Sequence, residues 1–527
     1  MATTDFDQSL VWDGALSGIR LYLGAIGLGL AIFLTGVEAS IVSTSLVTIT
    51  NDLGGSLLAQ SQRSLVIWSN CGTILGVKWT LLTSILFFVI FSGGCAAAEA
   101  VSQLIICRAF QGLAGAGVYS LTLFSFLRIV PYEQYDKISS VAGAILSLGL
   151  VLGPLFGGAI ASGGSWRWVF LCNVPAGSLA FVLIFSVLPA RFPHQPEAST
   201  DESRPKPIRI WDKIVTSFRQ LDLVGSFLIF TACSFIIAAL QEGNFRLPWS
   251  SAMVISFLVI SGLSWIAFIW WEWFIHRLDS EIIPMFPWRL TMNRAFMGAA
   301  LGFFTTGLPL TVCVLNLPQR FQTVNGSSPI GAGVKLLAFA LSCPIGIMAC
   351  SFLAGRLRVP FSYIALFGII FQAIGLFLFS GIASTTELWT GQFGYLALGG
   401  LGVGLSMATF TMIAPLVVNE KDQSIALGIG LQLRMLGGVL GVAASAAILN
   451  HYLQSRLSSI LPPEELSALL ETTEAILTFP PEIQISVREV FAMAYSAQIK
   501  LSAAFSVAQL LALAMIWRRP NIRYLKE

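Results

Sequence analysis

The feature that most constrains this chain is a series of long apolar runs, each long enough to cross a lipid bilayer. A membrane-spanning helix needs about 20 largely apolar residues. Such a series predicts an all-α polytopic membrane protein, because in lipid only helices and closed barrels satisfy the backbone hydrogen bonds. Thirteen runs reach that length, near 21–43, 79–98, 103–127, 138–162, 168–189, 222–240, 251–274, 295–316, 330–354, 361–382, 392–418, 424–449 and 499–517.

Composition supports the membrane class and argues against several others. Of the 527 residues, 55% are hydrophobic and only 11% are charged, whereas soluble domains carry about 25% charged residues. The formal net charge of +3 makes nucleic acid an unexpected partner. The three histidines and eight cysteines show no metal-ligand spacing. We therefore expect neither an enzyme nor a metal or cofactor site.

The second crossing is the weak point of the predicted topology. The apolar stretch 64–77 has fourteen residues, which rise about 21 Å as a helix, short of a roughly 30 Å hydrocarbon core. If it spans, there are fourteen helices and both termini lie on one side. If it does not, the N-terminus lies on the other side. We favour fourteen, because bilayers tolerate a mismatch of a few ångströms.

Basic residues predict which side faces the cytoplasm. The segment 190–220 carries six Lys and Arg residues, whereas the opposite loops 241–250 and 317–329 carry one Arg each. Loops rich in Lys and Arg stay in the cytoplasm. We therefore expect both termini to be cytoplasmic and the long, partly helical segment 450–498 to be external.

These observations divide the chain into six parts. They are a cytoplasmic N-terminal tail (1–17), an N-terminal helical half (18–189), a basic cytoplasmic linker (190–220), two additional helices with a loop (221–294), a C-terminal helical half that includes the external loop 450–498 (295–517), and a cytoplasmic tail (518–527).

Two motifs follow each other between 141 and 177. The first is a row of small residues interrupted by a proline, and the second is an aromatic entry to the next run. In water such a row would cost a helix several kcal/mol by propensity, but in lipid small residues let two helices approach closely. The residues are Gly149, Gly153, Pro154, Gly157 and Gly158, then Trp166, Arg167, Trp168, Asn173 and Pro175.

Ionisable residues inside predicted spans are candidates for function, because a charge at membrane depth is costly. Glu38 lies in the first span, where a buried carboxyl can take up and release a proton as access alternates; the alternative is a solvated carboxyl near the external interface. Arg108 starts a run that includes Gln111. The alternative to a functional role is that the Arg108 side chain extends to the outer interface. Arg434 lies in the thirteenth predicted helix.

Together these motifs resemble the major facilitator superfamily, in the fungal form of its fourteen-helix drug:proton antiporter branch. The small-residue row resembles the antiporter motif of the fifth helix, and the aromatic entry with Asn173 and Pro175 resembles the start of the sixth. The runs at Arg108 and Arg434 resemble RxxQGxGxG and RxxGGxxG motifs. The resemblance implies two six-helix halves with two extra central helices.

The resemblance also implies a function. It indicates secondary active efflux of small amphipathic organic compounds (drugs, toxins or secondary metabolites) by proton antiport. Glu38, Arg108, Gln111 and Arg434 would serve proton coupling and transport, and the glycine row would serve gating. We expect a monomer in the lipid bilayer of the plasma membrane, or of the vacuole, with a proton gradient in place of a cofactor. A siderophore–iron transporter of the same superfamily is the alternative.

One departure from the family pattern bears on activity. Members normally carry a loop like GxLSDxxGRKxxL between helices two and three, whose charges latch the inner gate. Here Gly76 and Lys78 remain, whereas the Asp and Arg are absent. A transport-inactive membrane protein is therefore a second alternative.

The sequence also contains one glycosylation sequon. Asn325-Gly326-Ser327 lies in the predicted external turn 317–329. Because that turn is close to the bilayer, we expect low occupancy at Asn325.

Overall fold

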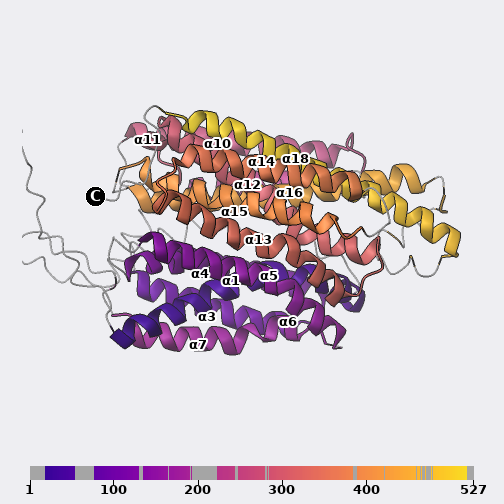
Figure 1. Ribbon diagram of the computed structural model, residues 1–527, viewed down its shortest axis with the longest axis horizontal. Helices are drawn as coiled ribbons and strands as arrows, with labels where there is room; N and C mark the ends of the chain where they lie inside the picture. Colours follow the sequence, from indigo (N-terminus) through magenta and orange to yellow (C-terminus); the bar gives the residue numbers. More distant parts are fainter. Residues whose placement is uncertain are drawn as a thin grey trace, which may run out of the picture.

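The helices lie side by side along the longest axis of the molecule and form one elongated bundle (Figure 1). The structure is a computed structural model, and we describe the residues whose placement it defines. These are 18–53, 76–129, 135–163, 165–189, 222–243, 247–278, 284–383, 389–419, 422–458 and 479–518, with a few single residues between those ranges.

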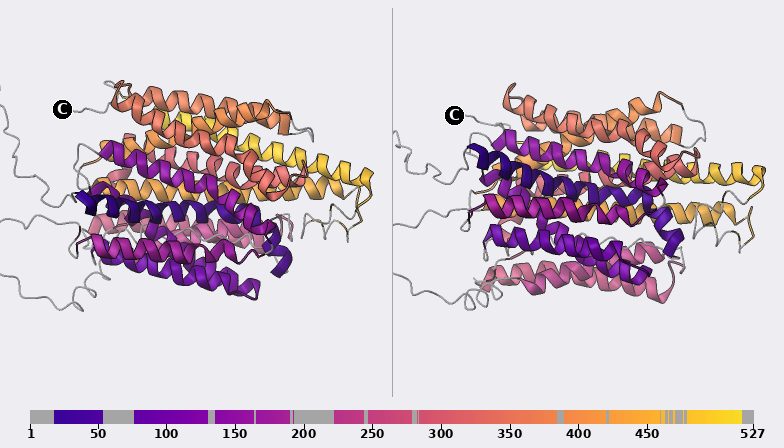
Figure 2. Two further views of the ribbon diagram at one scale, coloured as in Figure 1. Left: turned by 60° about the horizontal axis from the view of Figure 1, so that its bottom comes forward. Right: turned by 90° about the horizontal axis from the view of Figure 1, so that it is seen from below.

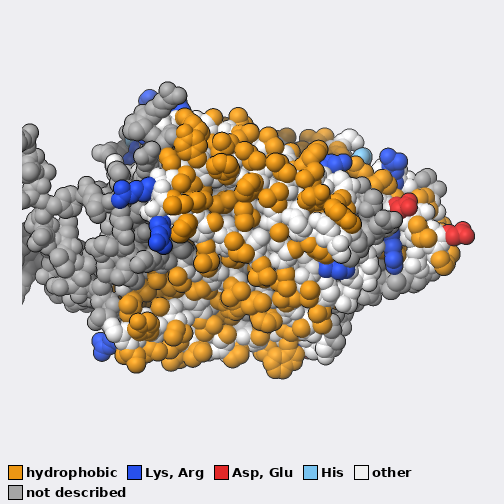
Figure 3. All heavy atoms as spheres, viewed as in Figure 1, with side chains coloured by type: hydrophobic (Ala, Val, Ile, Leu, Met, Phe, Trp, Pro, Cys, Tyr) orange, Lys and Arg blue, Asp and Glu red, His pale blue; other side chains and the backbone are white. Residues whose placement is uncertain are grey.

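Within these ranges, thirteen helices are long and apolar enough to cross a membrane, and each falls on one of the thirteen predicted runs. Their outward faces carry many exposed large apolar side chains, such as Ile90, Leu263 and Phe377. Figure 3 shows these apolar atoms covering the flank of the bundle, with the charged side chains towards its two ends. This is the surface that a bilayer requires.

In the described part of the N-terminal half, five helices are of membrane length, and the last of them is entered through one short turn of helix. They are α1 (Gly18–Leu53), α3 (Val77–Ala96), α4 (Val101–Arg128), α5 (Tyr135–Ser162), and α6 (Trp168–Leu171) continued by α7 (Asn173–Val187).

Two accessory helices come next and pack on each other, and the C-terminal half follows. The accessory helices are α9 (Leu223–Glu242) and α10 (Ala252–Leu278). The C-terminal half comprises the short α11 (Trp288–Thr291), then α12 (Arg294–Thr323), α13 (Pro329–Gly355), α14 (Phe361–Ala383), α15 (Gln392–Leu416), α16 (Gln423–Leu457) and α18 (Pro481–Ile516).

The described helices fix the direction of the chain through the bundle. We call the end at which α1 begins and near which the C label lies the basal end, and the other the distal end (Figure 1). The Nζ atom of Lys78, at the start of α3, donates to the carbonyl of Leu188 just after α7, and Gly27 near the start of α1 packs on Ile184. α3 therefore begins basally, whereas α1 ends distally.

If α1 ends at the distal end and α3 begins at the basal end, the chain between them must cross the bundle once. Fourteen crossings with both termini on one side require that additional crossing. The short stretch 64–75, on which that prediction turned, lies outside the described residues.

The two halves meet mainly along α5 and α13. Ile347 of α13 touches the position where Gly143 would carry a Cβ. Nearer the distal end, a Cβ on Gly333 would lie 3.3 Å from the carbonyl oxygen of Pro154. Backbones this close leave room only for small residues. The contact therefore forms a long seam between the halves.

The last helices extend further than the apolar runs predicted. The runs 424–449 and 499–517 become α16 and α18, which reach past the other helices at the distal end (Figures 1 and 2). Apolar side chains make this extension possible, because Leu457, Phe491 and Tyr495 join a separate buried cluster there. The distal projection, as we call these outer turns, thus has a small core of its own.

The predicted turn 317–329 also differs from the structure. α12 continues to Thr323, so its last turns contain Pro318 and Arg320. The Arg320 side chain is fully buried, with its guanidinium 5.5 Å from the ring centre of Phe379. A proline is tolerated here because neighbouring helices compensate for the lost backbone bond. Asn325 lies in the distal turn that follows, where its amide oxygen accepts a hydrogen bond from Arg320.

Candidate functional site

The first site is an ion pair between two helices of the N-terminal half. The Nη1 atom of Arg108 in α4 donates to Oε1 of Glu38 in α1. The two side chains are only 14% and 10% exposed, respectively. The two charges predicted separately thus form one buried unit, in which Glu38 is largely shielded from solvent.

Side-chain amides complete the surroundings of this pair. Nδ2 of Asn173, at the start of α7, donates to Oε2 of Glu38. Arg108 also donates to Oε1 of Gln111 at 3.0 Å, and Nε2 of Gln111 donates to the hydroxyl of Ser92 in α3 at 2.7 Å. The network therefore joins α1, α3, α4 and α7. Both carboxylate oxygens of Glu38 accept a hydrogen bond, as a buried carboxylate requires.

Aromatic residues of the next motif close the network on its distal side. The guanidinium of Arg108 lies 5.4 Å from the ring centre of Phe170, and the buried Trp166 meets Phe170 edge to face at 6.1 Å. Arg167 donates to the carbonyl of Ala98 at 3.2 Å. Trp168 is 58% exposed and faces outward, as does Pro175. The motif thus excludes water around the charges, which strengthens their attraction.

The glycine row positions α1, and with it Glu38. A Cβ on Gly149 would lie 2.6 Å from the carbonyl oxygen of Phe33, and one on Gly153 would overlap Ser40. These two glycines therefore press α5 against α1 within the same half. Gly158 instead faces the opposite half, because a Cβ on it would lie 2.9 Å from the carbonyl oxygen of Pro329 in α13. Gly157 and Pro154 are buried in the same helix.

Arg434 occupies a separate place between the halves. Its Nη2 atom in α16 donates to the hydroxyl of Tyr119 in α4 at 2.6 Å, and both residues are buried. Tyr119 is eleven residues beyond Arg108 on the same helix, a rise of about 16 Å. The structure therefore brings Glu38, Arg108 and Gln111 together but leaves Arg434 apart from them.

Close packing directs the Arg434 side chain. A Cβ on Gly307 of α12 would overlap the carbonyl oxygen of Arg434, and one on Gly437 would overlap that of Phe304. The glycines after Arg434 thus hold α16 against α12 and leave the arginine facing α4.

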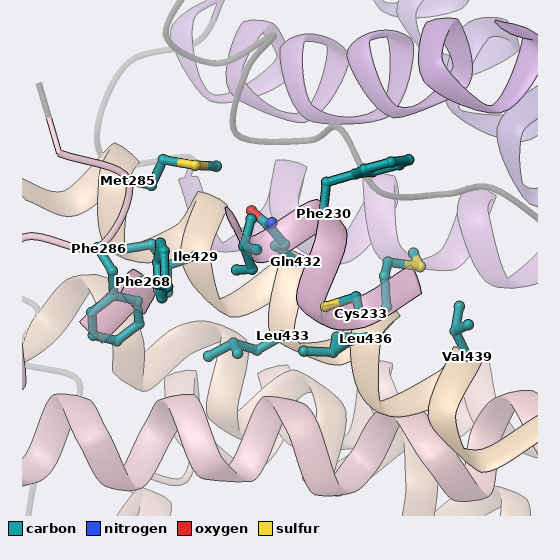
Figure 4. A pocket seen from close by; sticks show the side chains of 12 residues that line it. Phe230, Cys233, Phe268, Met285, Phe286, Ile429, Gln432, Leu433, Leu436 and Val439 are labelled. Atoms are coloured by element: carbon teal, nitrogen blue, oxygen red, sulfur yellow. The ribbon is translucent and has the colours of Figure 1, made fainter. Parts of the chain in front are cut away.

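An apolar pocket lies on another face of α16 (Figure 4). Phe230 of α9, Phe268 of α10 and Leu436 of α16 contribute to its lining, in which Gln432 is the single amide. Gln432 and Arg434 are two residues apart, about 200° around the helix. One side of α16 thus meets the accessory helices through apolar contacts, and the other presents a charge to the N-terminal half.

Two features of the site were not visible in the sequence. Asn173 is part of the recognised motif, yet only its contact with Glu38 shows that it binds the carboxylate. Tyr119 belongs to no motif, although its position on the Arg108 side of α4 follows from helical periodicity.

The described helices thus form two halves, with a buried ion pair in one half and a buried arginine between the two. Residues 28–316 match the Major Facilitator Superfamily model. The chain is 37% identical over 514 residues to the MFS-type transporter FPY5 of Fusarium mangiferae, covering 95% of this chain and 84% of that one.

It is 29% identical over 469 residues to the aspyridones efflux protein of Neocamarosporium betae, covering 86% and 79% of the two chains. The chain therefore belongs to the Major Facilitator Superfamily, whose members are transporters and not enzymes. The fold agrees. A bacterial homolog of the human lysosomal transporter Spinster superposes with a TM-score of 0.59 at 13% identity, covering 95% of this chain and all of that one.

Proposed function

We propose that the protein exports small amphipathic organic compounds in exchange for protons, as its two halves alternate access to the two sides of the membrane. The observation that carries this proposal is the buried pair of Glu38 and Arg108. A carboxylate buried within a membrane-spanning helix is a candidate for function, because its burial is costly.

Protonation would change the contacts that Glu38 makes. As a carboxylate it accepts hydrogen bonds from Arg108 and Asn173, which hold α1 to α4 and α7. A proton on Glu38 removes the charge that attracts Arg108, and turns one acceptor oxygen into a donor. Proton binding thus loosens one packing of the N-terminal half, which is how a proton can bias an equilibrium between two states.

The relatives support export as the direction of transport. One is named an aspyridones efflux protein, and another, 29% identical over 535 residues, is named efflux pump dotC of Dothistroma septosporum. We extend that direction to this chain and keep amphipathic organic compounds as the substrate class.

The basic residues support the proposed orientation. The exposed Arg277 lies in the last turn of α10, and Arg518 follows the basal end of α18. The basal end would then face the cytoplasm, in a plasma-membrane monomer.

Dye efflux tests the proposal. Yeast lacking its own exporters would express the protein or its Glu38→Gln variant and be loaded with a fluorescent amphipathic dye. We expect the parental chain to extrude the dye, and the variant or a protonophore to reduce the rate at least tenfold.

Glu99→Gln serves as the matched control, because Glu99 is an exposed acidic residue at the distal end. It should leave efflux within twofold of the parental rate. Efflux that survives both Glu38→Gln and the protonophore would refute proton coupling. A lack of efflux from protein that reaches the membrane would refute export of this class.

A further inference from the structure

Arg434 is a buried cation with a neutral partner. It is 4% exposed, and it donates at 2.6 Å to the hydroxyl of Tyr119, which is 5% exposed. A phenol accepts a hydrogen bond but carries no charge to balance a guanidinium.

Among the residues that the structure describes, no carboxylate forms an ion pair with Arg434. The ion pairs among the described residues use Glu38 and Asp422, and neither involves Arg434. Of the helices that pack on α16, α12 and α15 contain no Asp or Glu, and α9 and α18 carry theirs near one end, at Glu242, Glu482 and Glu489. A charge left unbalanced inside a membrane protein costs several kcal/mol at least. A negative charge that arrives from outside the chain would balance it.

Depth and position also suit a ligand. Arg434 is eleven residues from the start of α16, or about 17 Å into a core that is roughly 30 Å thick. It belongs to one half and Tyr119 to the other. In transporters built from two repeats, substrates bind near the middle of the membrane between the halves.

We propose that Arg434 binds the anionic group of the transported compound, so that the substrates are amphipathic organic acids. This inference rests on the proposed efflux function. The planar guanidinium offers paired donors that match a carboxylate, sulfonate or enolate. Tyr119 holds the side chain in the state seen here, and an arriving anion takes over that hydrogen bond.

The rival explanation is that the bond between Arg434 and Tyr119 serves only to fasten the two halves. In that case either partner is equally necessary, and the charge of the ligand is irrelevant. The two explanations therefore differ in what Tyr119→Phe and an uncharged ligand should do.

Equilibrium binding to the purified full chain in lipid nanodiscs separates them. The probes are 8-anilino-1-naphthalenesulfonate and its uncharged relative N-phenyl-1-naphthylamine, with the fluorescence of empty nanodiscs subtracted. We expect Arg434→Gln to weaken sulfonate binding at least tenfold and to change binding of the neutral dye less than twofold. Arg434→Lys should restore part of the sulfonate affinity.

Two further variants make the result specific. Arg277→Gln removes an exposed charge at the basal end and should change neither dye. Tyr119→Phe removes the competing partner, so sulfonate binding should be unchanged or tighter. Equal losses for both dyes in Arg434→Gln, or a loss in Tyr119→Phe that matches Arg434→Gln, would overturn the inference in favour of a fastening role.

Transport in proteoliposomes with an imposed proton gradient distinguishes this inference from the proposed function. Transport of the neutral dye without Arg434-dependent binding of the sulfonate leaves efflux standing and overturns anion recognition. Arg434-dependent binding without transport of either dye supports anion recognition and counts against export.

Discussion

At the scale of single residues, Arg108 shows why the type of cation matters. One of its nitrogens contacts acceptors on two residues, Glu38 in α1 and Gln111 in its own helix. A lysine ammonium can replace the charge but not the planar arrangement of donors. The flat guanidinium also lies 5.4 Å from the ring centre of Phe170, so we expect the network to depend on arginine at this position.

Arg108→Lys should reduce dye efflux at least tenfold while the protein still reaches the membrane. Arg167→Lys is the matched control, because Arg167 lies at the same end and donates to a single backbone carbonyl. We expect that control to keep more than half of the parental rate in the same cells. Equal rates for the two variants would show that the shape of the cation at Arg108 is irrelevant.

The sequence predicted Glu38, Arg108 and Gln111 as candidates but not their arrangement. Glu38 and Arg108 are 70 residues apart, and their contact depends on how α1 and α4 pack. Arg320 was expected in a loop because it follows a predicted span, yet the helix carries it into a buried aromatic setting. Hydropathy reports the ends of apolar runs, whereas the ends of helices depend on packing beyond them.

At the scale of helices, glycines allow close packing between helices of the same half. A Cβ on Gly404 of α15 would overlap the carbonyl oxygen of Cys343 in α13. Gly394 in the same helix has nothing within 4 Å of the position where its Cβ would be. The same residue type thus has opposite roles within one helix.

Gly404→Ala should destabilise the protein by about 1–3 kcal/mol, because the added methyl group forces two backbones apart. Gly394→Ala should be neutral or slightly stabilising, since glycine costs about 1 kcal/mol in a helix. Thermal unfolding of the detergent-purified variants measures both. Equal melting temperatures would contradict the described packing of α13 and α15.

The distal projection gives a second test at this scale. Phe491 is buried in its core, and Ile485, six residues earlier in α18, is 59% exposed. Phe491→Ala should cost about 3–5 kcal/mol and open the projection to limited proteolysis from the distal side. Ile485→Ala should leave the cleavage pattern unchanged; rapid cleavage of that variant too would show that the projection lacks a packed core.

At the scale of the whole molecule, the proposed alternation of access requires the seam between α5 and α13 to change. A Cβ on Gly333 would lie 3.5 Å from the Cα atom of Leu155, close enough for a disulfide after substitution of both by cysteine. Oxidation of the Leu155→Cys, Gly333→Cys double variant should stop efflux, and a reductant should restore it. The two single variants are the controls. Efflux that continues through a complete cross-link would show that this part of the seam stays closed throughout transport.

Much of the architecture was predictable because the bilayer imposes a length and a composition on every crossing. The thirteen runs could be read from apolar residues alone. The distal extension of α16 and α18 could not, because its outer turns are covered by each other and not by lipid. The glycine row was recognised as a packing motif, but which helix it faces depends on the three-dimensional arrangement, and α5 turned out to use it on both α1 and α13.

The accessory helices have a consequence for how the molecule can be extended. Their described packing joins α9 and α10 to each other, to α11 and to α16. Helices anchored on the C-terminal half can move with it as one body, without opposing a rotation of that half against the N-terminal half. A fluorescent protein inserted in the loop between α9 and α10 could therefore report the proposed rotation between the halves.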